Sequence, residues 1–265
     1  DVERSRGLGD VYKRQLIESR GIDIVPESER TAKPSDLFWP WFAANISVFG
    51  ISYGSFILWF GISFWQAALV TAVGVTFSFF LCGLIAVAGK RGSAPTMVLS
   101  RAAFGVHGQK VPGIISWLTS IGWETFLSIM AVLATNTVLR QLGADPGTAV
   151  TVIATVIVAA LIVAASVLGY HTIIRMQSVL TWLTGAVTII YAVLAIPHID
   201  LDAVRAIPSG PASAVVGALV MAMTGFGLGW INIAADWSRY QRRDTSDGAI
   251  IFWNTFGGSV ATVVL

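Results

Sequence analysis

Apolar residues fill long stretches of the chain, and the charged residues fall between them. From Leu37 to Gly89 the sequence contains no Asp, Glu, Lys or Arg. One membrane-crossing helix needs only about 20 residues, so this window predicts a hairpin of two helices that turns near Gly61–Gln66. Further apolar windows are Val111–Leu139, interrupted only by Glu124, and Pro146–Ile174, Met176–Ile199, Ala206–Ala235 and Gly248–Leu265. The pattern predicts an all-α integral membrane protein with seven spans, the last of them cut short.

Composition and charge support a multi-pass protein of the cell (plasma) membrane. Of the 265 residues, 55% are hydrophobic and 12% are charged, whereas soluble domains have about 25% charged residues. A soluble enzyme is therefore not expected, and a scattered net charge of +2 argues against a nucleic-acid partner. With a cytoplasmic N-terminus, 15 of the 17 Lys and Arg residues lie on the cytoplasmic side, as the positive-inside rule requires.

The ends of the chain differ from its apolar body. Asp10–Gln15 resembles a translated transposon-end sequence used in preparing sequencing libraries, so we interpret residues 1–15 as an artefact. Residues 16–36 are predicted to form a cytoplasmic N-terminal segment, and residues 37–265 to form the transmembrane domain. Because the sequence stops inside an apolar run, we expect that this domain is truncated in its seventh helix.

Two spans carry a matching glycine pattern. Phe49–Tyr53 and Phe226–Trp230 both read Phe, Gly, any residue, small residue, aromatic, and they begin what would be two repeats of five helices. Glycine-interrupted helices at corresponding positions are typical of the binding sites of inverted-repeat transporters, because unwound backbone offers free N–H and C=O groups. The alternative is that these glycines only allow close helix packing, since Gly50 and Gly54, and likewise Gly225 and Gly229, have GxxxG spacing.

Glu124 is the one acidic residue in the middle of an apolar window. Carboxyl groups at membrane depth are costly and usually face a cavity or a partner, often on an ion or proton pathway. Small or polar residues recur with helical spacing around it and form one stripe that we expect to face the bundle interior. These residues are Ser120, Ser128, Ala131 and Thr135. A structural carboxyl group that is hydrogen-bonded between helices is the alternative.

Four stretches together resemble the nucleobase:cation symporters, the family of cytosine, purine, allantoin and hydantoin permeases. They are Pro26–Asn45, Gly92–Gly108, Gly122–Glu124 and Gly229–Tyr240. The resemblance extends from about Val25 to Leu265 and identifies the chain as an N-terminal part of a bacterial member. It implies a sodium-symporter type of fold with two inverted five-helix repeats, of which about seven of an expected twelve helices are present, so that residues 37–265 form a permease domain.

The resemblance also implies a binding site. Trp123 and Trp230 match the two family tryptophans that stack on opposite faces of the heterocycle, an arrangement that suits any planar ring. Leu127 stands where the cytosine and purine branch carries an amide, and Gln177 stands where that branch often carries a Glu. The identity of the substrate therefore stays open. Glu124 and Gln177, with exposed backbone around Gly50 and Gly229, are the candidates for contacts with the ring edge.

These observations predict a symporter that imports a nucleobase such as cytosine or a purine together with Na⁺ or H⁺, without a cofactor and without enzymatic activity. The family's cation site lies between first-helix carbonyls and eighth-helix hydroxyls, and this sequence lacks the eighth helix, so no metal site is assigned. Glu124 is a candidate for proton or cation coupling. A same-fold permease for allantoin, hydantoin or a thiamine precursor is the nearer alternative, and a membrane enzyme or structural subunit the more distant one. Oligomeric state is not predicted.

Overall fold

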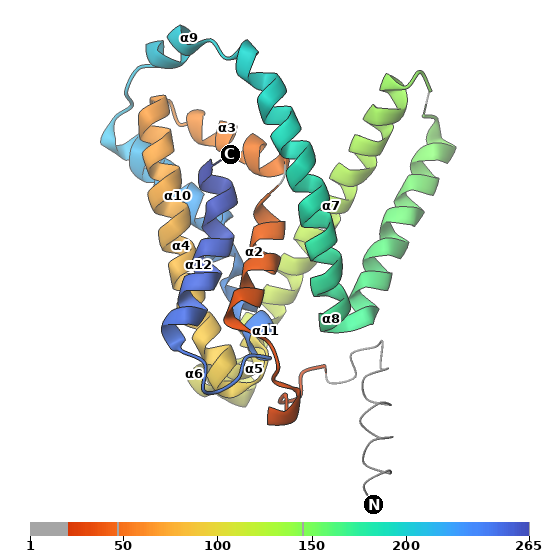
Figure 1. Cartoon of the computed structure of the whole chain (residues 1–265), viewed down its shortest axis with the longest axis vertical. Coiled ribbons are helices and arrows are strands. Elements are labelled where there is room, and N and C mark those ends of the chain that lie inside the picture. The colour runs from red at the N-terminus through yellow and green to blue at the C-terminus, as the bar shows by residue number, and fades with distance from the viewer. Residues whose placement is uncertain (1–20, 47, 145, 265) are drawn as a thin grey trace, which may run out of the picture. The chain divides into compact units, whose positions relative to one another are not determined.

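The computed structural model describes residues 21–46, 48–144 and 146–264, most of which are helical (Figure 1). The residues interpreted above as an artefact lie outside this part of the chain. The short elements are η1 (Glu27–Glu29), η2 (Pro34–Leu37), α5 (Thr96–Leu99), α6 (Arg101–Gly108), η3 (Ile196–His198), α9 (Leu201–Ala206), η4 (Gly227–Ile233) and α11 (Ala234–Ser238). The main helices are α2 (Phe38–Asn45), α3 (Val48–Leu58), α4 (Phe64–Gly92), α7 (Lys110–Gln141), α8 (Thr148–Ala195), α10 (Ala212–Gly225) and α12 (Asp247–Val264).

Five helical segments in the described residues are long and apolar enough to cross a membrane. They are Phe64–Gly92, Lys110–Gln141, Thr148–Val167, Ile173–His198 and Ala212–Ser238. They correspond to the second to sixth predicted spans, and the predicted turn between the first two spans lies directly before Phe64. The connection that the charge pattern predicts at Arg175 is helical, because α8 continues through it. The first span (α2 with α3) and the seventh (α12) stay predictions.

The chain divides into two compact units, which are described separately below. Among the described residues, unit 1 holds residues 104–175, with α7 and the first part of α8, and unit 2 holds residues 22–103 and 176–264. α6 crosses the boundary between the units and contains a non-helical residue, Gly105, with φ 71° and ψ 170°. A positive φ is a conformation that glycine adopts without strain.

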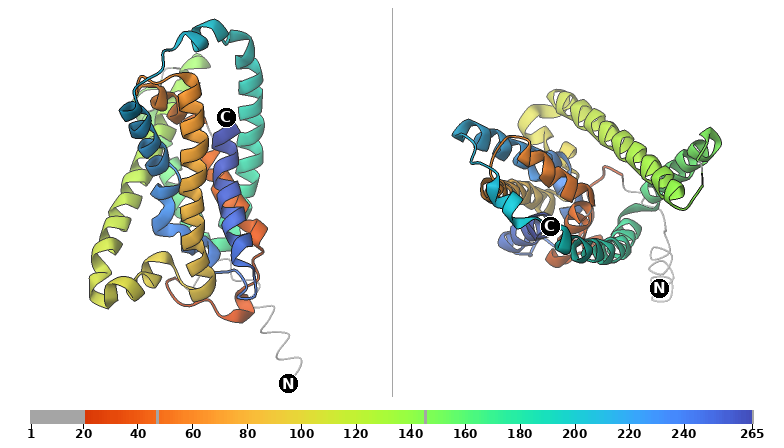
Figure 2. Two further views of the ribbon diagram at one scale, coloured as in Figure 1. Left: turned by 90° about the vertical axis from the view of Figure 1, so that its left-hand side faces the viewer. Right: turned by 90° about the horizontal axis from the view of Figure 1, so that it is seen from above.

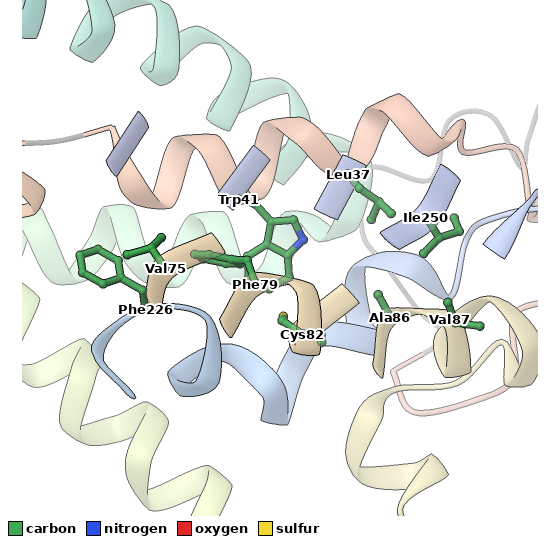
Figure 3. Close-up of a cluster of buried hydrophobic side chains, with 10 residues drawn as sticks. Leu37, Trp41, Val75, Phe79, Cys82, Ala86, Val87, Phe226 and Ile250 are labelled. Carbon is green, nitrogen blue, oxygen red and sulfur yellow. The ribbon is translucent and has the colours of Figure 1, made fainter. Parts of the chain in front are cut away.

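α4 is the central helix of unit 2. It packs against α10, α11, α12 and η4, and it lies between α10 and α12 in the left view of Figure 2. One face of α4 contributes Val75, Phe79 and Cys82 to a buried cluster, which Figure 3 shows with Trp41 of α2 beside Phe79 and with Phe226 beside Val75. The centroids of the Trp41 and Phe79 rings are 5.8 Å apart. This cluster joins α2, α4, α12 and the segment after α10.

The N-terminal segment of unit 2 is bound to the end of α4 and to the segment after α11. The Val25 N–H donates to the Ser93 carbonyl at 2.9 Å, and the Ala32 N–H donates to the Tyr240 carbonyl at 3.2 Å. The buried guanidinium of Arg30 donates to a backbone carbonyl in the last turn of α4. Three of the stretches that carry the family resemblance therefore meet at one end of this unit.

An ion pair at the same end joins α4 to the start of α12. The Lys90 ammonium contacts the Asp247 carboxylate and donates to the Thr245 carbonyl at 2.9 Å. Arg91 contacts the same carboxylate from the surface. Hydrogen bonds, the stronger effect coming from Lys90 and the weaker from Arg91, hold the pKa of Asp247 below its usual range. The side chain of Lys90 is only 8% exposed and that of Arg91 is 69% exposed, so the two cations differ mainly in burial.

The opposite end of unit 2 is held by one glutamine. The Gln66 Nε2 donates to the Gly210 carbonyl at 3.1 Å, and the Gly210 N–H donates to Gln66 Oε1 at 2.8 Å. Gln66 also forms a capping box with Ser63 at the start of α4. This side chain therefore joins the turn before α4 to the segment that precedes α10.

The two cations on Asp247 give a matched test of the packing at the end of α4. Replacing buried Lys90 by Met removes a charged donor from the Thr245 carbonyl, so we expect Lys90→Met to lower the melting temperature by about 5 °C. Arg91→Met removes an exposed pair and should change it by no more than about 1 °C. Thermal unfolding of the complete protein in detergent measures both. Equal effects of the two substitutions would contradict the structural role assigned to Lys90.

Candidate functional site

The sixth predicted span is interrupted at the glycines that the sequence pattern marks. α10 ends at Gly225, Phe226 has non-helical φ −112° and ψ −114°, and η4 follows as a tighter 3₁₀ turn before α11 begins. Gly225, Gly227 and Gly229 alternate with larger residues here. Glycine is the least favourable residue in a helix interior apart from proline, and 3₁₀ geometry in a helix often marks a functional site.

Gly227 is in close contact with α4. A Cβ at this position would lie 2.6 Å from the Ser78 carbonyl oxygen, so only glycine fits. The freed N–H of Gly227 donates to Ser78 Oγ at 3.1 Å, and Ser78 donates to the Val75 carbonyl at 2.9 Å. Gly74, Ser78 and Cys82 follow one another at four-residue intervals, so these small side chains form a row along α4. That row lets the interrupted segment approach the backbone of α4.

The other end of the interrupted segment is held by Thr96, in the connection after α4. The carboxylate of Asp236 accepts hydrogen bonds from the Thr96 N–H at 2.7 Å and from its hydroxyl at 2.8 Å. The Ala235 N–H donates to Thr96 Oγ1 at 2.9 Å, and Ser238 Oγ donates to the Ala86 carbonyl of α4 at 2.5 Å. Side-chain hydroxyls therefore attach both ends of η4 to α4 and its connection.

The first predicted span is interrupted too, but four residues before Gly50. α2 ends at Asn45, whose Nδ2 donates to the Trp41 carbonyl at 2.6 Å. Ile46 is non-helical, with φ −84° and ψ 83°, and α3 begins at Val48. Gly50 lies in the first turn of α3. The Phe49–Tyr53 pattern itself is helical, so the break in this span lies before the predicted position, at Ile46.

Trp230 lies on η4 and is half-buried. Its ring packs against Trp41 at 6.0 Å between centroids and 72° between planes. The preceding residue, Gly229, is exposed, and its N–H donates to the Phe226 carbonyl at 3.0 Å. Phe226 in turn packs edge-on against Tyr53 of α3, 5.0 Å between centroids. Aromatic side chains from both interrupted helices therefore meet beside η4.

Gln177 lies on the second part of α8, within unit 2, and is half-buried. Its Oε1 atom is buried and has no hydrogen-bond partner. An unsatisfied buried carbonyl oxygen costs about 1–3 kcal/mol, so this amide is available to a partner. Contact between Gln177 and a substrate stays a prediction.

Trp123 and Glu124 lie on α7 in unit 1, and both side chains are exposed. The hydroxyls of their stripe bond to their own helix, as in Ser128 Oγ donating to the Glu124 carbonyl at 2.7 Å. Because Trp123 belongs to unit 1 and Trp230 to unit 2, stacking of one ligand between them stays a prediction. The same holds for contacts of Glu124 with substrate or ion.

The sequence interpretation missed Ser78 and Thr96. Ser78 is one hydroxyl between phenylalanines, and its only signal is the four-residue spacing to Gly74 and Cys82. Thr96 belongs to the loop that carries the family resemblance, but nothing in its neighbours along the chain indicates that it binds Asp236. Among the described residues, no group of three or more His, Cys, Asp or Glu side chains could hold a metal ion.

Comparison with known proteins identifies several relatives. The model of the family "Permease for cytosine/purines, uracil, thiamine, allantoin" matches residues 24–265. A Bacillus subtilis protein with the provisional name purine-cytosine permease is 27% identical over 248 residues, covering 93% of this chain and 52% of the relative. A purine-cytosine permease of Emericella nidulans is 25% identical over 256 residues, covering 94% and 47%. The allantoin permease of Bacillus subtilis is 29% identical over 127 residues, covering 45% and 25%.

A solved structure shares the fold. Mhp1, a nucleobase-cation-symport-1 family transporter in a closed conformation with bromovinylhydantoin bound, gives a TM-score of 0.76 at 21% identity. The match covers 94% of this chain and 56% of Mhp1. It confirms the predicted all-α membrane fold of the sodium-symporter type. The chain spans about half the length of Mhp1 and of the two purine-cytosine permeases that it matches.

The interrupted helices, the transporter fold and the family model agree with the resemblance seen in the sequence. Because the model covers nearly the whole chain, the chain belongs to the family of permeases for cytosine and purines, uracil, thiamine and allantoin.

Proposed function

We propose that the complete protein is a symporter that imports a nucleobase such as cytosine or a purine together with Na⁺ or H⁺. The observation that carries this proposal is the interruption of the sixth span at η4, which presents Trp230 and the backbone of Gly229 beside the interrupted first span. In secondary transporters, discontinuous helices of corresponding positions form the substrate site near the bilayer midplane. The family consists of permeases rather than enzymes.

Stacking on Trp230 would contribute binding affinity for any planar ring but no specificity for a particular ring. A nucleobase has two π-faces, and an indole stacks on either of them. In our proposal Trp230 takes one face and Trp123 takes the other. Selection then comes from polar groups at the ring edge, because a site that hydrogen-bonds a substrate strongly rejects analogues that leave its groups unpaired. The free Oε1 of Gln177, the Glu124 carboxyl and the backbone near Gly50 and Gly229 are the proposed edge contacts.

Coupling to a cation fits the shape of the first span. α2 ends in mid-span at Asn45, and the carbonyl end of a helix carries partial negative charge that favours a cation. Half-helix C-terminal ends of this kind coordinate Na⁺ in other transporters. Glu124 is the proposed alternative carrier, since a carboxyl at membrane depth can exchange a proton when it gains access to water.

We propose the plasma membrane as the location, with the N-terminus in the cytoplasm. The N-terminal segment binds the end of α4 and the segment after α11, so these positions share one side of the membrane. Lys90, Arg91, Arg239, Arg242 and Arg243 lie at this end, and Lys and Arg in short connections favour the cytoplasm. Gln66 and Gly210 meet at the other end of the unit.

A permease for allantoin, a hydantoin or a thiamine precursor is the alternative that specific observations favour. The allantoin permease aligns with part of the chain, and Mhp1 was solved with bromovinylhydantoin bound. Leu127 also replaces the amide of the cytosine and purine branch. The rings of allantoin and hydantoin are not aromatic and stack less well on an indole, so a permease for either should depend less on Trp230 than a permease for a nucleobase.

Trp230→Ala tests the stacking site. In a permease-deficient host that expresses the complete gene, we expect saturable uptake of one compound from a panel of cytosine, adenine, uracil, allantoin, a hydantoin and a thiamine precursor. If that compound is a nucleobase, loss of the indole should reduce its uptake at least about tenfold, since a stacked base contributes about 1–3 kcal/mol. Trp65, which is 73% exposed at the start of α4, gives the control Trp65→Ala with unchanged uptake. Normal uptake by Trp230→Ala would refute the site assignment.

Glu124→Gln tests coupling. If Glu124 carries the proton, Glu124→Gln should abolish the pH dependence of uptake while the protein still binds substrate, because Gln cannot titrate. Uptake against a proton gradient and against a sodium gradient, measured separately, distinguishes the two coupling ions. A variant that keeps the wild-type pH profile would exclude Glu124 as the proton carrier.

Ser78→Ala tests whether the contact with Gly227 positions the site. Removal of the hydroxyl leaves the buried N–H of Gly227 without its acceptor, a loss of about 1–3 kcal/mol, so we expect KM to rise about tenfold with normal amounts of protein in the membrane. Ser100→Ala is the matched control, because Ser100 Oγ donates only to the Met97 carbonyl of its own turn. Equal KM values for the two variants would show that Ser78 does not position the substrate site.

A further inference from the structure

Tyr53 of α3 lies against the point where α10 ends. A Cβ on Gly225, the last residue of α10, would lie 2.7 Å from Cε1 of Tyr53 and would also contact its phenol oxygen. The ring of Tyr53 thus occupies the space of a side chain at position 225. The same ring packs edge-on against Phe226, with 80° between the ring planes. One side chain of the first predicted span therefore contacts both residues at which the sixth span leaves its helix.

This contact belongs to a longer zone of packing between the α3 segment and α10. Ile57, one turn after Tyr53, is buried in a cluster that includes Ala218 of α10. Phe60, in the turn after α3, has its Cε1 atom 2.9 Å from where a Cβ on Gly217 would lie. Large side chains of the α3 segment thus meet small residues of α10, which lets the two approach closely. Residue numbers rise along one as they fall along the other, so the two segments run antiparallel.

Of these three contacts, the one made by Tyr53 lies at the break of the sixth span. Phe226 has backbone angles outside the helical region, and its side chain is only 6% exposed. It packs beside Val75 of α4 (Figure 3) and against the ring of Tyr53. Closely packed interiors leave a side chain little room to move. Contacts from α3 and α4 therefore restrict the rotation of the Phe226 backbone.

The conformation of Phe226 determines where the proposed substrate contacts lie. Its carbonyl accepts the hydrogen bond of the Gly229 N–H at 3.0 Å, so the turn that begins at Phe226 carries Gly229 and then Trp230. Rotation of the Phe226 backbone would displace both of them. Such a displacement matters for function, because a misplacement of about 1 Å in a site can cost about a hundredfold in rate.

From these contacts we propose that Tyr53 is a positioning residue of the substrate site. Its ring fixes the direction in which the chain leaves α10 and so holds Gly229 and Trp230 in place. Tyr53 acts through Phe226 rather than through contact with the substrate, and it makes the break of the sixth span depend on a residue of the first. Its role is separate from that of Ser78, which reaches the break from α4. The inference rests on the proposed function, in which the segment after Phe226 binds the heterocycle.

Uptake kinetics of the complete protein test this role. Tyr53→Leu keeps an apolar side chain and removes the ring, so we expect KM for the transported compound of the heterocycle panel to rise about tenfold, with kcat changed less than about twofold. Tyr53→Phe keeps the ring and should stay within about threefold of the wild-type KM. Phe60→Leu is the matched control, because it removes a ring from the same packing zone but at Gly217, away from the break. Its KM should stay within about twofold of wild type.

Hydrogen–deuterium exchange of the purified complete protein gives a readout that does not depend on transport. Exchange rates report local opening of the backbone, so amides of residues 226–233 should exchange at least about tenfold faster in Tyr53→Leu than in wild type. The amides of α12 should exchange at the wild-type rate in this variant. Phe60→Leu should leave the exchange of residues 226–233 unchanged.

A double substitution tests whether Tyr53 and Gly225 act through one contact. Gly225→Ala places a methyl group where the ring lies, so it should also speed the exchange of residues 226–233. Because substitutions at residues in contact are not additive, the double variant Tyr53→Leu/Gly225→Ala should exchange more slowly than the product of the two single effects. Effects that multiply would contradict a shared contact.

Unchanged KM or unchanged exchange of residues 226–233 in Tyr53→Leu would overturn the proposal. Equal effects of Tyr53→Leu and Phe60→Leu would overturn it too, because packing of α3 on α10 would then explain both. If Tyr53→Leu does not reach the membrane, Gly225→Ala carries the exchange test, and unchanged exchange in that variant counts against the proposal. If the wild type takes up none of the compounds but its exchange at the break depends on Tyr53, the proposed function fails and the positioning of the break stands.

Discussion

Every backbone polar group that a helix releases inside a bilayer needs a new partner, because hydrocarbon offers none. Unit 2 satisfies this constraint at the break between α10 and α11. The Gly227 N–H donates to the Ser78 hydroxyl, and the Ala235 N–H donates to the Thr96 hydroxyl. Hydrogen bonds of the 3₁₀ type satisfy part of the segment between these two positions. The interruption depends on hydroxyls from α4 and from the connection that follows it, and the absence of a side chain on Gly227 allows α4 to come close enough.

α4 is the helix that meets this need, and much of unit 2 is organised around it. Its row of small residues accepts the interrupted sixth span, its aromatic Phe79 packs with Trp41 of α2, and its last turn receives the N-terminal segment and the start of α12. Thus elements from both proposed repeats pack against the single helix α4. The position of Trp230 follows from the length and composition of α4 as much as from the glycines around Trp230 itself.

Hydrophobic windows were enough to predict the second to sixth spans, and the glycine pattern was enough to predict the interruption of the sixth, because both signals are local. The position of the first break could not be read in the same way. It falls at Ile46 rather than Gly50, where nothing in the local sequence disfavours a helix as strongly as glycine does. Ser78 was missed for a related reason. A hydroxyl in an apolar helix ordinarily bonds to its own backbone, and only contacts with distant segments distinguish the exceptions.

The partners of α4 also set an order of events during biosynthesis. The acceptor of the Gly227 N–H is made 149 residues before its donor, so α4 enters the membrane well ahead of the helices that cover its polar face. Until then Ser78 has only the Val75 carbonyl of its own helix as a partner. α4 must therefore enter the membrane without the help of those contacts, and the mean hydropathy of 2.2 over an 18-residue window of this helix meets that requirement. A polar replacement on the α10-facing side of α4 would thus first impair insertion of this helix at the translocon, before its native contacts with later helices have formed.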